Sequence, residues 1–166
     1  MKYILNIFIV CILLLSCSTK QTTNIELRDK LIAKIDTSAF RLVPSHTSLV
    51  ELDEFFEGNF DNSSIAPNLQ NHPGTSFFYK TLKEIKNKSE VNNIFVEIKD
   101  IVFDTPKSLG TNWPYSNAIC IITSATDNEI LKWVKKLSPE NSLGTTLPPS
   151  NIEVPTGYSI KTIWWD

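Results

Sequence analysis

Apolar residues recur at helical spacing in four parts of the chain, with charged residues between them. Ser48 with Glu51, and Thr126 with Glu129, also have the spacing of a capping box, in which each side chain caps the other residue's amide. Because the stripe and the capping signals agree, these parts are predicted to be helices. Their ranges are 24–35, 48–58, 75–88 and 126–137.

Other apolar runs have the length or the alternation of β-strands. Residues 93–103 alternate, with Ile94, Val96 and Ile98 on one face, whereas 118–123 is continuously apolar, as in a strand covered on both sides. Pro67 argues against a central position for the run that contains it, because proline cannot donate to a sheet ladder. The predicted strands are 40–43, 63–69, 93–103, 118–123 and 158–165.

From residue 63 onward the predicted order is strand, helix, strand, strand, helix, strand. This order is typical of the ferredoxin-like split βαβ fold, in which the third strand is central. The most apolar strand, 118–123, takes that place, and 40–43 is the alternative to 63–69 as the other central strand. We therefore predict an α+β fold in a single domain, residues 24–166, with an extra N-terminal helical segment.

The N-terminus has the pattern of an export signal. Residues 3–15 are apolar apart from Asn6, and 13 residues of helix reach about 20 Å, short of the ~30 Å of a bilayer core. The sequence Leu14-Leu15-Ser16-Cys17 resembles the lipobox of bacterial lipoproteins, which implies cleavage before Cys17 and acylation of its thiol. Residues 1–16 are then the signal peptide and 17–23 a polar tether. The alternative is an ordinary cleaved signal.

The lipobox leaves one cysteine for the folded domain. Cys11 is lost with the signal and Cys17 carries lipid, so Cys120 has no partner for a disulfide within the mature chain. Aliphatic neighbours and the lack of a nearby basic residue favour a small buried side chain at Cys120 over a nucleophile.

Charge and composition exclude several classes of function. The net charge of −2 becomes −3 when the signal peptide and its Lys2 are removed, which argues against nucleic-acid binding. There is no His-x-x-x-His, Cys-x-x-Cys or Gly-rich phosphate loop, so we expect no metal and no cofactor. The acidic cluster of 51–61 has a calcium or carboxylate-pair site as its alternative. However, Glu51, Asp53, Glu54 and Glu57 have the spacing of a solvated helix face and lack the alternating ligands of a calcium loop. The lysines of 80–88 and 132–136 are solubilising, or contact anionic headgroups if the chain is tethered.

In the predicted topology, the loops 70–74, 104–116 and 138–157 meet at one end of the sheet, and long loops often carry function. Aromatic, amide and acidic side chains gather there, which makes this end a candidate binding edge. The alternative is that Trp113 pins its loop to the sheet and that His72 is a turn residue. The candidate residues are His72, Asp104, Asn112, Trp113, Tyr115 and Tyr158.

Several short motifs resemble one uncharacterised family of small bacterial proteins, over roughly residues 40–166. The resemblance implies no activity and no catalytic residue, and it does not extend to a lipobox. The motifs are FFEGN at 55–59, SIAPNL at 64–69, HPG at 72–74, VEI at 96–98, WPYSN at 113–117, IITSA at 121–125 and the closing GY…WWD at 157–166.

Together these features predict a non-enzymatic binding protein of the cell envelope, held in the membrane by lipid on Cys17 and facing the periplasm or the exterior. Ser18 stands where an aspartate would retain a lipoprotein in the inner membrane of enterobacteria, which favours the outer membrane if there is one. A protein partner is expected for the alternative, an immunity or inhibitor protein that masks a toxin or hydrolase. A third hypothesis is a hydrolase that uses Asp104, His72 and Tyr115.

Overall fold

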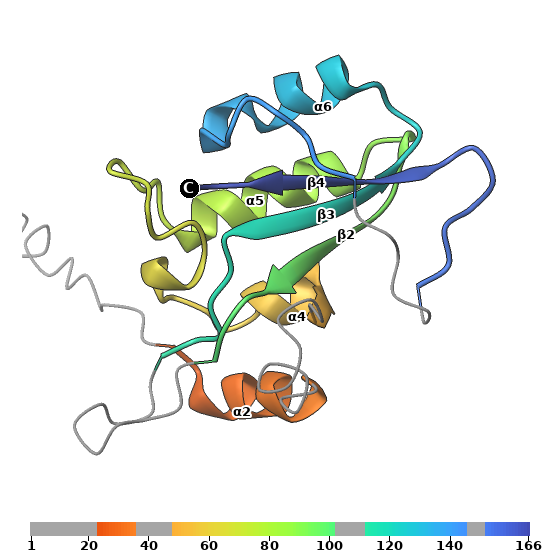
Figure 1. The fold of residues 1–166 in the computed structure, drawn as a ribbon. Helices are drawn as coiled ribbons and strands as arrows, with labels where there is room; N and C mark the ends of the chain where they lie inside the picture. The colour runs from red at the N-terminus through yellow and green to blue at the C-terminus, as the bar shows by residue number, and fades with distance from the viewer. Residues whose placement is uncertain (1–22, 36–47, 102–111, 146–151) are drawn as a thin grey trace, which may run out of the picture.

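Four strands form one antiparallel sheet in which neighbours in sequence are also neighbours in space (Figure 1). The computed structural model describes residues 23–35, 48–101, 112–145 and 152–166. Within these ranges the strands follow the order β1-β2-β3-β4, so β2 and β3 are central. The strands are β1 (Ser48–Glu51), β2 (Val91–Ile98), β3 (Ala118–Thr123) and β4 (Ser159–Trp164).

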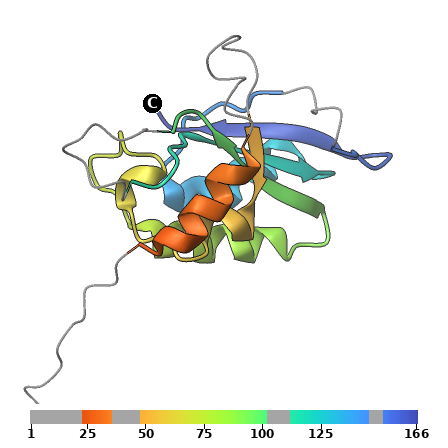
Figure 2. The ribbon, with the colours of Figure 1, turned by 90° about the horizontal axis from the view of Figure 1, so that it is seen from below.

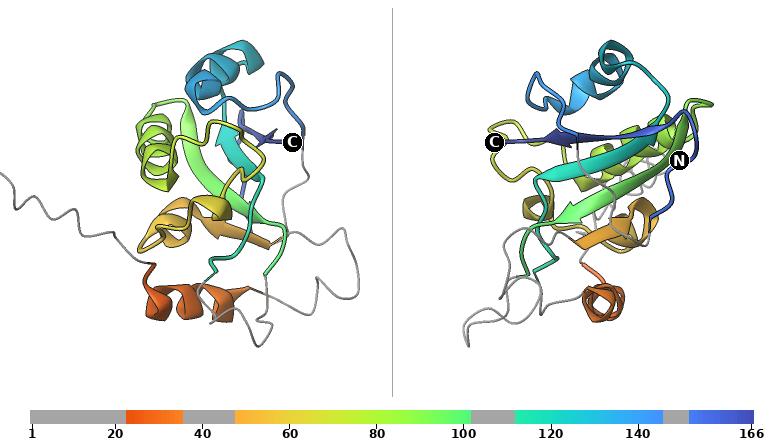
Figure 3. Two further views of the ribbon diagram at one scale, coloured as in Figure 1. Left: turned by 90° about the vertical axis from the view of Figure 1, so that its left-hand side faces the viewer. Right: turned by 45° about the vertical axis from the view of Figure 1, so that its right-hand side comes forward.

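The helices gather on one side of this sheet (Figure 3, left). The α4 and α5 helices pack against β1 and β2, and α6 lies beside α5. Figures 2 and 3 show α2 next to α4, at the β1 edge. The described helices are α2 (Ile25–Lys34), α4 (Leu52–Phe56), α5 (Thr75–Lys86) and α6 (Asp127–Val134), with 3₁₀ turns η1 (Asn62–Ser64) and η2 (Lys135–Leu137).

Each face of the sheet carries its own apolar cluster. The larger one lies between helices and sheet, where Ile94, Val96 and Ile98 of β2 point toward α5 and its neighbours. The smaller one, on the opposite face, consists of Phe95, Cys120, Ile122 and Ile160, with Ile152, Val154 and Tyr158 packed against it. All six residues of β3 are buried, which confirms the prediction that 118–123 is covered on both sides.

The predicted α+β class is confirmed, but the strand order is not that of a ferredoxin-like fold. The first strand is β1, within the range that was predicted to be a helix from Ser48, and it pairs with β2 at the edge of the sheet. The range 63–69 is not a strand, because Ala66 turns the chain at φ 47° just before Pro67 and Ile65 alone bridges to Ser116. The alternative strand 40–43 lies outside the described residues.

The ends of three predicted helices are confirmed or refined by their caps. Asn24 caps α2 by accepting the amide of Leu27 at 3.2 Å, and Thr126 with Glu129 forms the predicted capping box of α6. At the start of α5, Gly74 is the N-cap residue, and the Asn62 side chain accepts the amide of Thr75 at 2.9 Å. The loop before α5 therefore supplies the cap that the helix's own residues do not.

In the part of the chain that the structure describes, no helix combines the length and the apolarity needed to cross a bilayer. The predicted signal peptide, Cys17 and most of the tether lie outside the described residues.

Candidate binding cleft between α4 and α5

A cleft of about 420 Å³ opens between α4, the turn that follows it and the first half of α5. This volume lies in the range of ~300–1,000 Å³ that is typical of small-molecule sites. The cleft combines aromatic rings with side chains of both charge signs. It is lined by Asp53, Phe56, Glu57, Gly58, Asn59, Phe60, Thr75, Ser76, Tyr79 and Lys80.

One side of the cleft is aromatic. The ring of Phe56 is buried and stacks on Tyr79, with the ring centroids 5.3 Å apart and the planes 18° apart. Phe60 is 36% exposed, so part of its ring faces solvent at the cleft. The preceding helix accounts for the exposure of Phe60. Leu52 and Phe55 of α4 are buried in the core, and the chain reaches the surface again at Phe60.

An ion pair and a hydrogen bond join α4 to α5 beside the cleft. The Tyr79 hydroxyl donates to the Asp53 carboxylate at 2.7 Å, and the Lys83 ammonium donates to both of its oxygens, at 2.9 and 3.1 Å. Burial raises the pKa of Asp53, but the hydrogen bonds from Tyr79 and Lys83 outweigh it and hold that pKa below its ordinary value. The bond to Asp53, together with burial, raises the pKa of Tyr79 to about 12.

The pKa shifts of Asp53 and Tyr79 limit the chemistry that these two groups can perform. At neutral pH, Asp53 is a charged acceptor whose oxygens are already in use, and Tyr79 is a protonated donor whose hydrogen is already committed. A general acid or base works best with a pKa near the working pH, whereas the pKa values of Asp53 and Tyr79 are both shifted away from neutrality. The arrangement therefore suits binding better than proton transfer.

Two charged side chains of the cleft are uncommitted. Glu57 and Lys80 both line it, both are exposed, and neither takes part in a hydrogen bond or ion pair within the described residues. Their charges have opposite signs, so the cleft offers one acceptor and one donor for charged groups of a ligand.

His72, which the sequence singled out, is committed to its own loop. Its Nδ1 accepts the amide of Gly74 at 3.0 Å, so the ring hydrogen is on Nε2, which donates to the Ile65 carbonyl at 2.7 Å. The ring also stacks on Phe78, with the centroids 5.2 Å apart. The geometry matches the interpretation of His72 as a turn residue.

Trp113 is similarly a packing residue. Its side chain is 2% exposed, and its amide donates to the Asp61 carboxylate at 3.3 Å. The neighbouring Asn112 is exposed, and its carbonyl accepts the guanidinium of Arg28 at 2.7 Å, which links this segment to α2. Trp113 therefore pins its loop, as the alternative interpretation has it.

The family-like motifs hold one another together at this end of the sheet. The Ser116 amide donates to the Ser64 carbonyl at 2.8 Å, and the Ala66 amide donates to the Ser116 carbonyl at 2.9 Å. The buried Asn59 side chain donates to the Ser64 hydroxyl at 2.9 Å. The motifs around residues 59, 64 and 116 thus join the loop after α4 to the segment before β3.

The predicted cluster is brought together only in part. His72, Trp113 and Tyr115 lie at the end of the sheet where β3 begins; the amide of Tyr115 pairs with the Asp100 carbonyl at 2.8 Å. Tyr158 lies at the other end, next to Ser159, which pairs with the last residue of β3. Six residues of β3 span about 17 Å, which separates Tyr158 from the rest. Asp104 lies outside the described residues.

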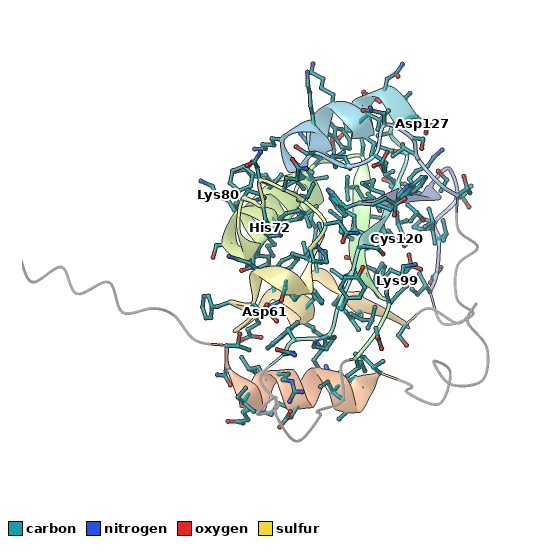
Figure 4. All side chains as sticks on the ribbon, turned by 60° about the vertical axis from the view of Figure 1, so that its left-hand side comes forward. Asp61, His72, Lys80, Lys99, Cys120 and Asp127 are labelled. Atoms are coloured by element: carbon teal, nitrogen blue, oxygen red, sulfur yellow. The ribbon has the colours of Figure 1, made fainter. Side chains whose placement is uncertain are left out.

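The sequence did not point to the cleft itself. Figure 4 shows Lys80, His72 and Asp61 on one side of the molecule and the buried Cys120, with Lys99, on another. A usable signal was Phe60, an aromatic residue directly after the turn that ends a helix. Among the described residues no group of three His, Cys, Asp or Glu side chains could hold a metal ion.

Comparison with known proteins matches the chain to an uncharacterised family. The family model described as "Uncharacterized protein YfbO family" matches residues 26–163. The chain is 30% identical over 122 residues to "Uncharacterized protein YfbO" of Escherichia coli (strain K12), an alignment that covers 71% of this chain and 82% of that protein. No solved structure matches the chain.

Proposed function

The chain belongs to the Uncharacterized protein YfbO family, which agrees with the expectation of an uncharacterised bacterial family, and we propose that this member is a lipid-anchored, non-enzymatic binding protein of the cell envelope. Its membrane partner is reached through lipid on Cys17, and its ligand site is the cleft between α4 and α5. The names of the family and of the matched relative state no activity, so the proposal rests on residues of this chain.

The observation that carries the binding role is the pairing of Tyr79 with Asp53 at 2.7 Å. It removes the two groups that would otherwise be candidates for acid–base chemistry, and it leaves aromatic rings and two uncommitted charges around a cavity. His72 does not restore a hydrolytic mechanism, because both of its ring nitrogens already have partners.

The anchoring role is supported by the lipobox-like sequence and by where the domain begins. Cys17 precedes α2 by a polar stretch, residues 18–24, whose seven residues span at most about 24 Å when fully extended. The Asn24 amide donates to the carbonyl of Gly58, which lines the cleft. An anchor on Cys17 would therefore hold the cleft close to the membrane surface.

The test is acyl labelling of the full chain in a bacterial host with a palmitate analogue. Cys17→Ser is expected to abolish labelling and the membrane retention that depends on it, whereas Cys11→Ser, six positions earlier in the same signal, should leave the mature protein labelled. Continued labelling of Cys17→Ser would refute the anchor.

The binding site has a separate test with an exposed residue. Pull-downs from detergent-solubilised envelopes should compare the wild type with Phe60→Ser. Phe60 is exposed at the cleft, so its replacement leaves the core intact, whereas replacing the buried Trp113 would disturb the core. Loss of bound lipid or protein in Phe60→Ser supports the cleft. An unchanged profile argues against it.

A further inference from the structure

The cleft offers charges of opposite sign at the end of the molecule where the tether attaches. We propose that it holds the headgroup of an aminophosphate lipid such as phosphatidylethanolamine, taken from the membrane in which the protein is anchored. This deepens the proposed function and rests on it, because the anchor is what would keep the cleft at a lipid surface.

Exposed apolar side chains mark the same end of the molecule. In the described part of the chain, the large hydrophobic residues with the most exposure are Ile25, Phe60 and Phe77, at 39%, 36% and 38%. They belong to the start of α2, the turn after α4 and the first turn of α5, which lie together on the left in Figure 1 and face the viewer in Figure 3, left. Exposed apolar residues of this kind lie favourably in a bilayer interface.

One side of the cleft is suited to a phosphate. It is formed by the first turn of α5, with Ser76 and the uncommitted Lys80, and the N-terminal end of a 12-residue helix favours an anion. The side chain of Asn62 takes the amide of Thr75, so the lysine and the serine are the groups left to meet the ligand.

The other side is suited to an ammonium group. Glu57 lines the cleft together with the exposed ring of Phe60, and aromatic faces attract cations. Glu57 is close enough for its charge to help raise the pKa of Tyr79. A ligand with only a phosphate would leave Glu57 as a repelling charge, and a ligand with only an amine would do the same with Lys80. A headgroup with both groups satisfies both side chains.

The first experiment measures headgroup binding by the full acylated chain in detergent, with saturation-transfer NMR and sn-glycero-3-phosphoethanolamine as the probe. We expect binding by the wild type and roughly a tenfold loss in each of Glu57→Gln and Lys80→Gln, the effect of removing one charged hydrogen bond. Lys132→Gln is the matched control, since Lys132 is an exposed lysine on α6 without a partner in the described structure. The proposal would be overturned if the wild type bound glycerol 3-phosphate as tightly as sn-glycero-3-phosphoethanolamine. It would also be overturned if both cleft variants bound the probe as tightly as the wild type.

The second experiment asks whether the lipid in a bilayer is the occupant. Amide hydrogen exchange of residues 57–60 and 75–80 is compared in vesicles of phosphatidylethanolamine with phosphatidylglycerol and in vesicles of phosphatidylcholine with phosphatidylglycerol. We expect these amides to exchange more slowly in the vesicles that contain phosphatidylethanolamine. The Glu57→Gln, Lys80→Gln double variant should not show this slowing. Equal exchange in both vesicles overturns the docking. A chain that fails acyl labelling but binds the soluble probe refutes the anchor alone, so the two failures are distinguishable.

Discussion

The carbonyl of Gly58 accepts a 2.9 Å hydrogen bond from the amide of Asn24, and this bond joins the start of α2 to the rim of the cleft. The backbone of Gly58 has φ 71°, a conformation that favours glycine. A Cβ there would lie 2.8 Å from Leu27 Cδ1 and 2.9 Å from Asn24 Cβ. The glycine of the FFEGN motif is therefore required both by its turn and by the close approach of α2.

Gly58→Ala is expected to destabilise the fold by about 2–4 kcal/mol, from backbone strain plus overpacking against α2. Gly157→Ala is the matched control, because Gly157 also has a positive φ, of 86°, but a Cβ there would have no neighbour within 4 Å. It should lose only the strain, about 1 kcal/mol. Urea unfolding of the two variants measures the difference, and equal losses would contradict the role given to α2.

The bond between Tyr79 and Asp53 predicts a dependence of stability on alkaline pH. The pKa of Tyr79 is raised to about 12 from an ordinary value near 10, so the folded chain holds this proton more tightly than the unfolded chain. The stabilisation is fully present below pH 10 and is lost as the pH rises toward 12. Tyr79→Phe should be less stable at neutral pH and should lack this component of the alkaline decline.

Denaturation midpoints measured across the range from pH 8 to 12 test this dependence. Tyr115→Phe is the control, because the Tyr115 hydroxyl has no hydrogen bond within the described ranges and its backbone pairing is untouched by the change. An alkaline decline of the same steepness in wild type and Tyr79→Phe would show that Asp53 does not hold the tyrosine proton.

Local patterns predicted most of the elements but not the way in which they are joined. The helical stripes of α2, α5 and α6 and the apolar runs of β2, β3 and β4 are visible in the sequence because each buries one face or both. The range of β1 fits the stripe of the helix that follows it, and only its pairing with β2, as in Val50 opposite Val96, makes it a strand. Strand order depends on such long-range pairing, which no local spacing determines.

The same distinction explains the outcome at the candidate site. His72 and Trp113 were recognisable as candidates because both are ring residues next to a proline in predicted loops. His72 is held by near neighbours in sequence, Ile65, Gly74 and Phe78, whereas the Asp61 partner of Trp113 lies 52 positions away. The cleft takes residues from both sides of a long loop, such as Glu57 and Lys80. Their proximity follows from the packing of α4 on α5, which was not predictable from their spacing.

Cys120 is predicted to be unreactive in the folded chain. Burial raises the pKa of its thiol to about 11, against a smaller opposite effect of its bond to Thr162, and the side chain is fully buried. At pH 8 a thiol reagent should therefore label Cys120 only after unfolding. If Cys17 is acylated, the native mature chain shows no reactive thiol and the denatured chain shows that of Cys120. Rapid labelling of the native chain at Cys120 would contradict this burial.

The two fully buried tryptophans, Trp113 and Trp165, differ in whether the indole nitrogen has a hydrogen-bond partner. The Nε1 of Trp165 donates to the Leu137 carbonyl at 2.8 Å, which fastens the end of β4 to η2. The Nε1 of Trp113 is buried and has no hydrogen-bond partner in the described structure. Replacing each by phenylalanine removes a similar volume, but only Trp165→Phe leaves a buried carbonyl without its donor.

Trp165→Phe is therefore expected to cost about 1–2 kcal/mol more than Trp113→Phe, the difference that corresponds to one buried hydrogen bond and the stranded acceptor. Trp113→Ala, in contrast, should cost about 3–5 kcal/mol, because it empties the space that the indole fills behind the segment before β3. Free energies of unfolding in urea give all three values. If Trp113→Phe proves as costly as Trp165→Phe, the Trp113 nitrogen has a partner, and the loop it pins is held by more than packing.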